Sequence, residues 1–237
     1  MAEITPDDFL DRVAAGKIPP VVFLYGEEDY KTEECVNAAI AKTLDESSKG
    51  FNLDVLYGSK AAAKDVLAIA TSFPMMSERR VVVVKEFERL VIGDSARTLV
   101  MSYVDRPLES TVLLLAADDP DLRKKPFAEL KKKIDAVYCK PLWENQIPPW
   151  VFSYVKKHKR NIDDGACHML AAYVGTSLRA LSNEIEKLFI FLGDRTDITV
   201  DDVTSVVGAT KGFTVFDLQR AVGKKNVKEA TTIAQRM

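Results

Sequence analysis

A short acidic segment follows the first strongly apolar run of the chain and keeps part of the pattern of a phosphate-binding loop. The apolar run is residues 21–25, and the segment at residues 26–32 reads GEEDYKT. In nucleotide-binding loops of the form GxxxxGK[ST], glycines let backbone N–H groups surround the phosphates, and the lysine reaches the terminal oxygens. Gly26, Lys31 and Thr32 preserve part of this frame, but the glycine before the lysine is missing.

Three carboxylates, those of Glu27, Glu28 and Asp29, lie inside this segment. Unit charges ~4 Å apart interact by roughly 4 kcal/mol at an effective dielectric constant of ~20, so these carboxylates would repel a triphosphate. Acidic residues near the start of a helix are instead stabilised by the helix dipole. We therefore predict a strand-to-helix turn with a degenerate, inactive nucleotide loop. The alternative is an active P-loop NTPase with an aberrant motif.

Two further positions that an ATPase needs are also changed. Such enzymes end a later buried strand with an acidic residue that helps to hold Mg²⁺, but Lys85 follows the apolar run at residues 81–84. The run at residues 111–116 is followed by Ala117 and Asp118, and neither is an Asn or Thr that could sense a γ-phosphate. Three altered positions together predict a lost ATPase activity, with no catalytic residue and no cofactor in this chain.

The histidines and cysteines do not form a metal-binding pattern. His158 and His168 make no HExxH motif, and Cys35, Cys139 and Cys167 make no CxxC motif. Three free cysteines are typical of a reducing compartment. No apolar run approaches the ~20 residues that span a bilayer, and the first residues lack the pattern of a signal peptide. We predict no metal site, no membrane partner and a cytoplasmic location.

Three basic runs could follow a nucleic-acid backbone. They lie at residues 123–125, 131–133 and 156–160, in a chain whose formal net charge is −2. No aromatic residues of the kind that stack on bases are interleaved with them. The runs are therefore more typical of a solvated surface, and a DNA-binding module is kept as an alternative function.

A cluster of large apolar residues lies in a polar setting at residues 71–77. Phe73, Pro74, Met75 and Met76 are flanked by Thr and Ser residues. Phe and Met are typical anchors in the hydrophobic pocket of a partner protein, and Met adapts its shape to that pocket. We predict a partner-binding segment, and the alternative is the end of a helix packed on the core.

The order of elements predicts an α/β domain followed by helices. Five runs read as strands, at residues 21–25, 51–57, 81–84, 111–116 and 136–139, and helical spacing separates them. Alternating strands and helices predict a parallel sheet covered on both faces, here over residues 1–140. Residues 141–209 lack strand-like runs and predict a small all-α domain. Residues 210–237 begin a further helical segment that ends without a C-cap, so we expect the chain to be a fragment.

Several short motifs, in the order in which they occur along the chain, resemble the delta-subunit family of bacterial DNA polymerase III clamp loaders. The resemblance covers the chain from about residue 20 to its end, and the helix motif NEIEKL after the turn GTSLR is its most specific part. The segments that carry it are residues 21–28, 72–84, 139–142, 175–179, 183–188 and 213–218.

This resemblance implies an AAA+ fold without ATPase activity, a helical lid at residues 141–209 and the truncated start of a helical collar at residues 210–237. It implies a subunit of the DNA polymerase III holoenzyme that binds and opens the sliding clamp (beta) for loading onto primed DNA. The other implied partners are the gamma/tau and delta prime subunits, with primed DNA reached indirectly through the assembled complex.

The resemblance also assigns residues. It implies that the clamp contact lies on a helix just before the SERR stretch at residues 77–80, which places it at Phe73, Pro74, Met75 and Met76. The family usually has Leu-Phe where this chain has Met75-Met76. Arg179 matches a lid arginine that touches nucleotide in active AAA+ subunits, and without a working nucleotide loop we expect it to be structural.

Overall fold

The structure is a computed structural model that describes residues 3–208, 215–223, 227, 231 and 234. The chain divides into two compact units, Met1–Pro141 and Leu142–Met237. Most of the predicted collar segment at residues 210–237 lies outside the described residues, apart from helix α13 (Val215–Gly223). No helix among the described residues is long and apolar enough to cross a membrane.

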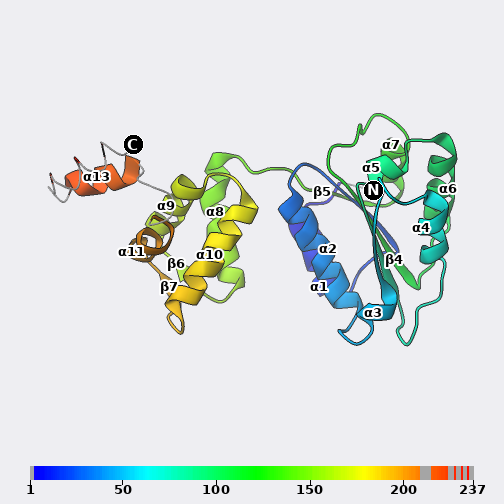
Figure 1. Ribbon diagram of the computed structural model, residues 1–237, viewed down its shortest axis with the longest axis horizontal. Coiled ribbons are helices and arrows are strands. Elements are labelled where there is room, and N and C mark those ends of the chain that lie inside the picture. The colour runs from blue at the N-terminus through cyan, green and yellow to red at the C-terminus, as the bar shows by residue number, and fades with distance from the viewer. Residues whose placement is uncertain (1–2, 209–214, 224–226, 228–230, 232–233, 235–237) are drawn as a thin grey trace. The chain divides into compact units, whose positions relative to one another are not determined.

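A five-stranded parallel sheet forms the centre of the first unit (Figure 1). Its strands lie in the order β2-β3-β4-β1-β5, and every neighbouring pair is parallel. The strands are β1 (Val21–Tyr25), β2 (Leu53–Tyr57), β3 (Arg80–Lys85), β4 (Thr111–Ala117) and β5 (Asp135–Tyr138). The five predicted strands are confirmed. The second starts at Leu53 rather than at residue 51, because residues 49–52 form a turn of helix.

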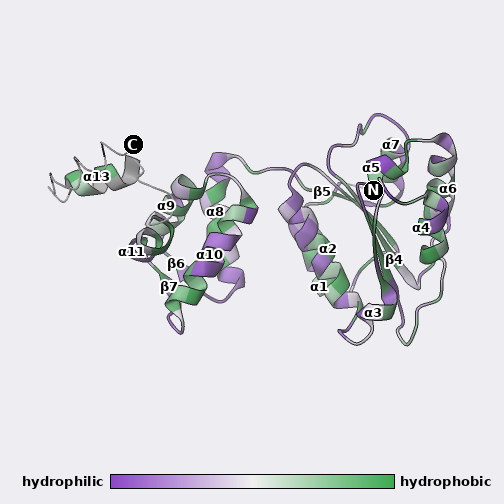
Figure 2. Ribbon diagram, in the orientation of Figure 1, coloured by the Kyte–Doolittle hydropathy of each residue, from purple (hydrophilic) through white to green (hydrophobic). Residues whose placement is uncertain are grey.

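Helices cover both faces of this sheet. Alternate residues of the central strands point to opposite faces, so Phe23 and Leu115 belong to one apolar core, whereas Leu24 and Leu114 belong to the other. Helices α1 and α2 pack on one face, and α4, α5, α6 and α7 on the other (Figures 1 and 2). The helices of this unit are α1 (Pro6–Ala14), α2 (Asp29–Thr43), α3 (Lys49–Asn52), α4 (Ala63–Ala70), α5 (Phe87–Leu90), α6 (Asp94–Asp105) and α7 (Phe127–Lys133).

Helices build most of the second unit. They are η1 (Glu144–Gln146), α8 (Ile147–Lys157), α9 (Asp164–Val174), α10 (Leu178–Leu192), α11 (Val200–Val203) and η2 (Thr204–Gly208). The expectation of an all-α domain misses one detail, a pair of two-residue parallel strands, β6 (Asn161–Ile162) and β7 (Asp197–Ile198). Two residues are too few to show the alternation by which strands are recognised in a sequence.

Candidate functional site

The predicted partner-binding residues lie in the loop that joins α4 to β3, residues 71–79, and not on a helix as the resemblance implied. The helix ends at Ala70, four residues before Pro74. A proline disfavours the helical conformation of the residue before it and donates no hydrogen bond itself. The hydroxyls of Thr71 and Ser72 donate to the carbonyls of Leu67 (2.8 Å) and Ala68 (2.8 Å) and satisfy the last turn of the helix.

Three large apolar side chains of this loop are exposed. Phe73 is 85% exposed, Met75 is 58% exposed and Met76 is 97% exposed, whereas Pro74 is partly buried. The alternative of a helix end packed on the core is therefore wrong for these three side chains. Exposure of neighbouring large apolar residues marks an interaction surface more often than isolated exposed ones do.

The loop is fixed at its start. The hydroxyl of Thr111, a buried residue at the beginning of β4, donates to the carbonyl of Ala70 at 2.7 Å. The hydroxyl of Tyr103 in α6 donates to the same carbonyl at 3.4 Å. One strand of the sheet, β4, and one helix that covers it, α6, thus hold the point at which the chain leaves α4.

The loop is also fixed at its end. Arg79 donates through Nε to the carbonyl of Glu109 (2.9 Å) and through Nη1 to the carbonyl of Ile18 (2.9 Å). Burial lowers the pKa of Arg79 from its usual value, while the nearby Glu109 raises it. Arg80 is buried at the start of β3 and pairs with Asp54 of β2, Nη2 to Oδ2 at 2.5 Å. The arginines of the SERR stretch therefore anchor the loop to the sheet.

The middle of the loop is held by Asn52. This side chain is fully buried and bonds to both the backbone N–H and the carbonyl of Met75. Asn52, Thr111 and Arg79 were not predicted as site residues. Asn52 and Thr111 lie 23 and 41 positions away from the residues that they hold, so no local sequence pattern links them to the loop.

The degenerate nucleotide loop lies at the opposite, carboxyl edge of the sheet, between β1 and α2. Glu28 is the N-cap of α2 and is buried, and its carboxylate accepts from the backbone N–H of Tyr30 at 3.3 Å. A helix N-terminus with free N–H groups is where such folds bind phosphate. The chain's own carboxylate occupies that position here.

Backbone packing also constrains the start of this loop. Gly26 has a φ of +128°, and a Cβ at this position would lie 2.2 Å from the carbonyl oxygen of Cys139. The N–H of Glu28 donates to the same carbonyl at 3.0 Å. Lys31 and Thr32 lie within the first turn of α2 rather than in a loop, and the hydroxyl of Thr32 donates to the carbonyl of Glu28 at 3.3 Å.

The ends of β3 and β4 carry acidic groups without the arrangement of a metal site. Glu86 follows Lys85 with a left-handed backbone (φ 53°) and lies 4.0 Å from Arg89, Oε2 to Nε. Burial raises the pKa of Glu88, and the charge of Asp118 adds to this effect. The part of the chain that the structure describes contains no group of His, Cys, Asp and Glu that could hold a metal ion.

Comparisons with known proteins place the chain in a family. A family model described as "DNA polymerase III, delta subunit" matches residues 23–140. The DNA polymerase III subunit delta of Bacillus subtilis is 30% identical over 235 residues, which is 95% of this chain and 67% of that protein. The chain belongs to the DNA polymerase III delta-subunit family. The resemblance drawn from the sequence motifs is therefore confirmed.

Solved structures agree with membership of the delta family. The DNA clamp loader delta protein of Bacillus subtilis is similar with a TM-score of 0.75 and 29% identity, covering 98% of this chain and 70% of that one. The RuvB Holliday junction branch migration motor of Thermotoga maritima, at 17% identity, has a TM-score of 0.52 over 90% of this chain and 71% of its own. The second likeness concerns the fold alone, and together the two confirm an AAA+-like architecture.

The chain also has a more distant relative. The replication factor C large subunit of Methanococcus maripaludis is 24% identical over 193 residues, covering 78% of this chain and 38% of that protein.

Arg179, the predicted lid arginine, lies in the first turn of α10 and is exposed. The helix begins at Ser177, the N-cap, whose hydroxyl accepts from the N–H of Ala180 at 3.3 Å. The carbonyl of Arg179 accepts from the hydroxyl of Ser182 at 2.9 Å. Its structural role in this delta-family chain stays a prediction.

The basic runs of this delta-family chain lie on the surface and are partly paired with acidic groups. Arg123 and Lys124 both contact Asp121, at 3.1 and 3.3 Å. Lys131 contacts Glu3 at 2.7 Å. Exposed pairs of this kind contribute little to stability, but they reduce the positive charge that these runs offer to a phosphate backbone.

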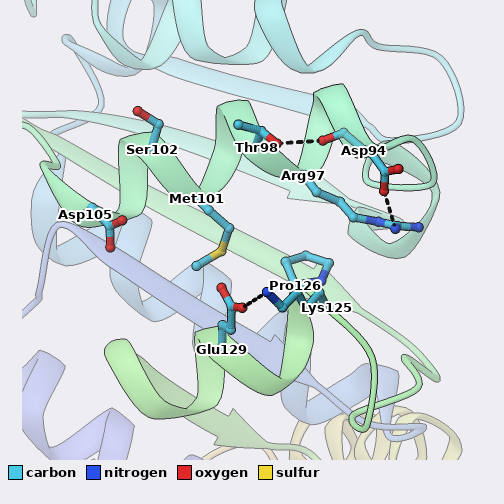
Figure 3. Close-up of a pocket in the computed structure, with 9 residues that line it drawn as sticks. All are labelled: Asp94, Arg97, Thr98, Met101, Ser102, Asp105, Lys125, Pro126 and Glu129. Atoms are coloured by element: carbon cyan, nitrogen blue, oxygen red, sulfur yellow. Dashed lines mark hydrogen bonds and ion pairs between the residues drawn. The ribbon is translucent and has the colours of Figure 1, made fainter.

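A cavity of about 510 Å³ lies between α6 and the segment around the start of α7 (Figure 3). The side chain of Met101 points from α6 toward α7 in this view. Two ion pairs lie at its rim, Arg97 with Asp94 at 2.9 Å and Lys125 with Glu129 at 2.8 Å, and a third lining carboxylate, Asp105, pairs with Lys133 of α7. None of the site residues predicted for this chain lines the cavity, and its charged side chains are paired within the protein, so they favour no particular ligand.

Proposed function

We propose that this chain binds the ring-shaped sliding clamp of DNA replication through residues 73–76, favours the opened ring, and does not hydrolyse ATP itself. Membership of the delta family supports a role in clamp loading. The observation that carries the proposal is the loop at residues 71–79. It exposes Phe73, Met75 and Met76 while hydrogen bonds fix its start, middle and end.

This combination suits binding to a hydrophobic groove. Burying one Met or Phe side chain contributes about 1.5–3 kcal/mol, so three exposed side chains provide enough apolar surface for a tight contact. A fixed loop loses less conformational freedom on binding than a free one, and more of that energy then appears as affinity. Met76 and Met75 adapt to the groove, and Phe73 supplies the aromatic anchor.

The carboxyl edge of the sheet supports the proposal that this chain is not an ATPase. The carboxylate of Glu28 accepts from an N–H group at the helix N-terminus, where phosphate would bind. Lys85 ends the strand from which an acidic residue would hold Mg²⁺. In the proposed complex, the gamma/tau and delta prime subunits supply the response to ATP and most contacts with primed DNA.

The clamp would be opened by differential binding. The closed and opened rings are in equilibrium, and a ligand shifts that equilibrium only by the difference between its affinities for the two states. The loop therefore favours the opened ring only to the extent that the clamp's groove fits the loop better in the opened ring than in the closed ring. Neighbouring subunits would control whether the loop is accessible.

Calorimetric titration with a purified bacterial sliding clamp tests this function. We expect saturable binding at one chain per clamp ring, and no heat on adding ATP and Mg²⁺ to the chain alone. Absence of clamp binding would refute the assignment of the sliding clamp as the partner. ATP hydrolysis by the isolated chain, abolished by Lys31→Ala, would refute the inactive nucleotide loop and favour the alternative of an active NTPase.

A further inference from the structure

The segment before β2 and the loop before β3 lie at the same edge of the sheet. The two strands are parallel neighbours, with Leu53 opposite Val81. Parallel strands begin at a common edge, so Asn52, which directly precedes β2, lies beside the loop that precedes β3. This placement brings a single buried amide to the centre of the exposed apolar segment.

The amide of Asn52 pairs with both backbone groups of one residue. Its Oδ1 accepts from the N–H of Met75 at 2.7 Å, and its Nδ2 donates to the carbonyl of Met75 at 2.8 Å. The second hydrogen of Nδ2 donates to the carbonyl of Ser48 at 3.1 Å. A flipped amide would place a donor against the N–H of Met75 and an acceptor against two carbonyls, so the partners fix its orientation.

The residue next to this contact has an uncommon backbone. Met76 has a φ of +53° and its side chain is 97% exposed. A residue other than glycine rarely adopts this left-handed conformation, and it persists where the surrounding structure imposes it. Because Asn52 holds the N–H and the carbonyl of Met75, it fixes the chain immediately before Met76.

The residues on either side, Phe73 and Met76, lack hydrogen bonds of this kind at their backbone N–H groups. Among the described residues, the N–H groups of Phe73 and Met76 make no hydrogen bond. The three exposed side chains are therefore presented from a backbone that is fixed at one central residue. Removing that contact would leave the core of the sheet in place and free the loop between its two ends.

We propose that Asn52 is a positioning residue for clamp binding, which holds the loop in the conformation that enters the clamp's groove. The inference rests on the proposed function, since it assigns a further residue to the same contact. Asn52 is fully buried, so it acts through Met75 and does not itself touch the clamp. Asn52 contributes to affinity because it orders the loop before binding, so the loop loses less conformational entropy when the clamp binds.

Hydrogen exchange of the native chain is the first test. Met75 is more than half exposed, yet we expect its amide to exchange at least about tenfold more slowly than that of Phe73, because only the former is hydrogen-bonded. Equal exchange rates at the two amides would overturn the proposal, whatever the variants do.

Clamp affinity of variants is the second test. Asn52→Ala should raise the Kd for the clamp about tenfold, equivalent to about 1.4 kcal/mol, and should abolish the protection of the Met75 amide. The matched control is Asn37→Ala, an exposed asparagine of α2, which should change neither. Wild-type affinity in a folded Asn52→Ala chain would overturn the proposal.

A double-mutant cycle separates positioning from general destabilisation. In a Met75→Ala/Met76→Ala background, Asn52→Ala should cause a clearly smaller further loss, below about fourfold, because two of the three side chains that the loop presents are gone. An equal tenfold loss in both backgrounds would overturn the positioning role. Unchanged clamp binding by Met75→Ala/Met76→Ala itself would instead refute the assignment of the loop in the proposed function.

Discussion

Truncating both exposed methionines, Met75→Ala/Met76→Ala, should weaken clamp binding without weakening the fold. Met76 is 97% exposed and Met75 is 58% exposed in the free chain. Neither side chain belongs to the two apolar cores of the sheet. Substitutions at such surface positions usually change stability by less than about 0.5 kcal/mol, so any larger effect on binding reports on the contact with the clamp.

The magnitude follows from the area that each side chain can still bury. Complete burial of a methionine contributes about 1.5–3 kcal/mol. Met76 can contribute nearly all of this on binding, and Met75 a little more than half, because the rest is already covered. With the retained Cβ atoms subtracted, the double variant should lose about 2–4 kcal/mol, or ~30- to 700-fold in Kd.

Calorimetry with a bacterial sliding clamp measures this loss, and thermal unfolding measures stability in the same buffer. The matched control is Ile92→Ala, because Ile92 is an exposed apolar residue of the same unit, 71% exposed and remote in sequence from the loop. The control should bind as the wild type does. Clamp binding by the double variant within about twofold of wild type, with a normal unfolding midpoint, would refute the reasoning.

The remaining predictions concern the fold and the proposed inactivity of the nucleotide loop. Gly26→Ala should destabilise the chain by about 3 kcal/mol or more in urea unfolding, because its φ is +128° and the new Cβ would lie 2.2 Å from a backbone oxygen; Gly50→Ala, with open space around it, should be neutral or stabilising. Calorimetry with Mg-ATP should show no binding, and heat that disappears in Lys31→Ala would contradict the inactive loop. Hydrogen bonds from Arg195 hold the pKa of Asp202 below its usual 3.8. The stability that Asp202 adds is therefore present above about pH 4 and lost as the pH falls through the folded-state pKa. The unfolding midpoints of wild type and Asp202→Asn should accordingly differ at pH 7 and converge once the pH is below the folded-state pKa of Asp202, and a constant difference would contradict this pairing.

The sheet could be predicted from the sequence because burial on both faces leaves a simple signal. The runs at residues 81–84 and 112–116 are uninterrupted and apolar, and all their residues are buried in strands β3 and β4. Phe51 misled the interpretation of the edge strand, since it continues the alternation of Leu53 and Val55. Its own turn of helix is set by contacts that begin at Ser48, which the alternation does not reveal.

The candidate site was only partly predictable. Composition pointed to Phe73 and the methionines, because a contiguous group of large apolar residues in a polar setting is typical of an interaction surface. The residues that fix the loop could not be predicted from the sequence, since Asn52 and Thr111 are ordinary polar residues far from the loop positions that they contact. Such contacts depend on which strands become neighbours, and the sheet order is not encoded in any short segment of the chain.

The two edges of the sheet have opposite properties, and this bears on how ATP could control the proposed clamp contact. Ligands of parallel α/β sheets usually bind at the carboxyl edge, where the carboxylate of Glu28 accepts from the N–H of Tyr30 and Gly26 packs against the carbonyl of Cys139. The apolar loop extends from the amino edge, fixed by Asn52 and Arg79. With an inactive nucleotide loop, as proposed, ATP has no route to the apolar loop through this chain itself. In the proposed complex, ATP must therefore act through neighbouring subunits that cover or uncover a loop whose shape is already set.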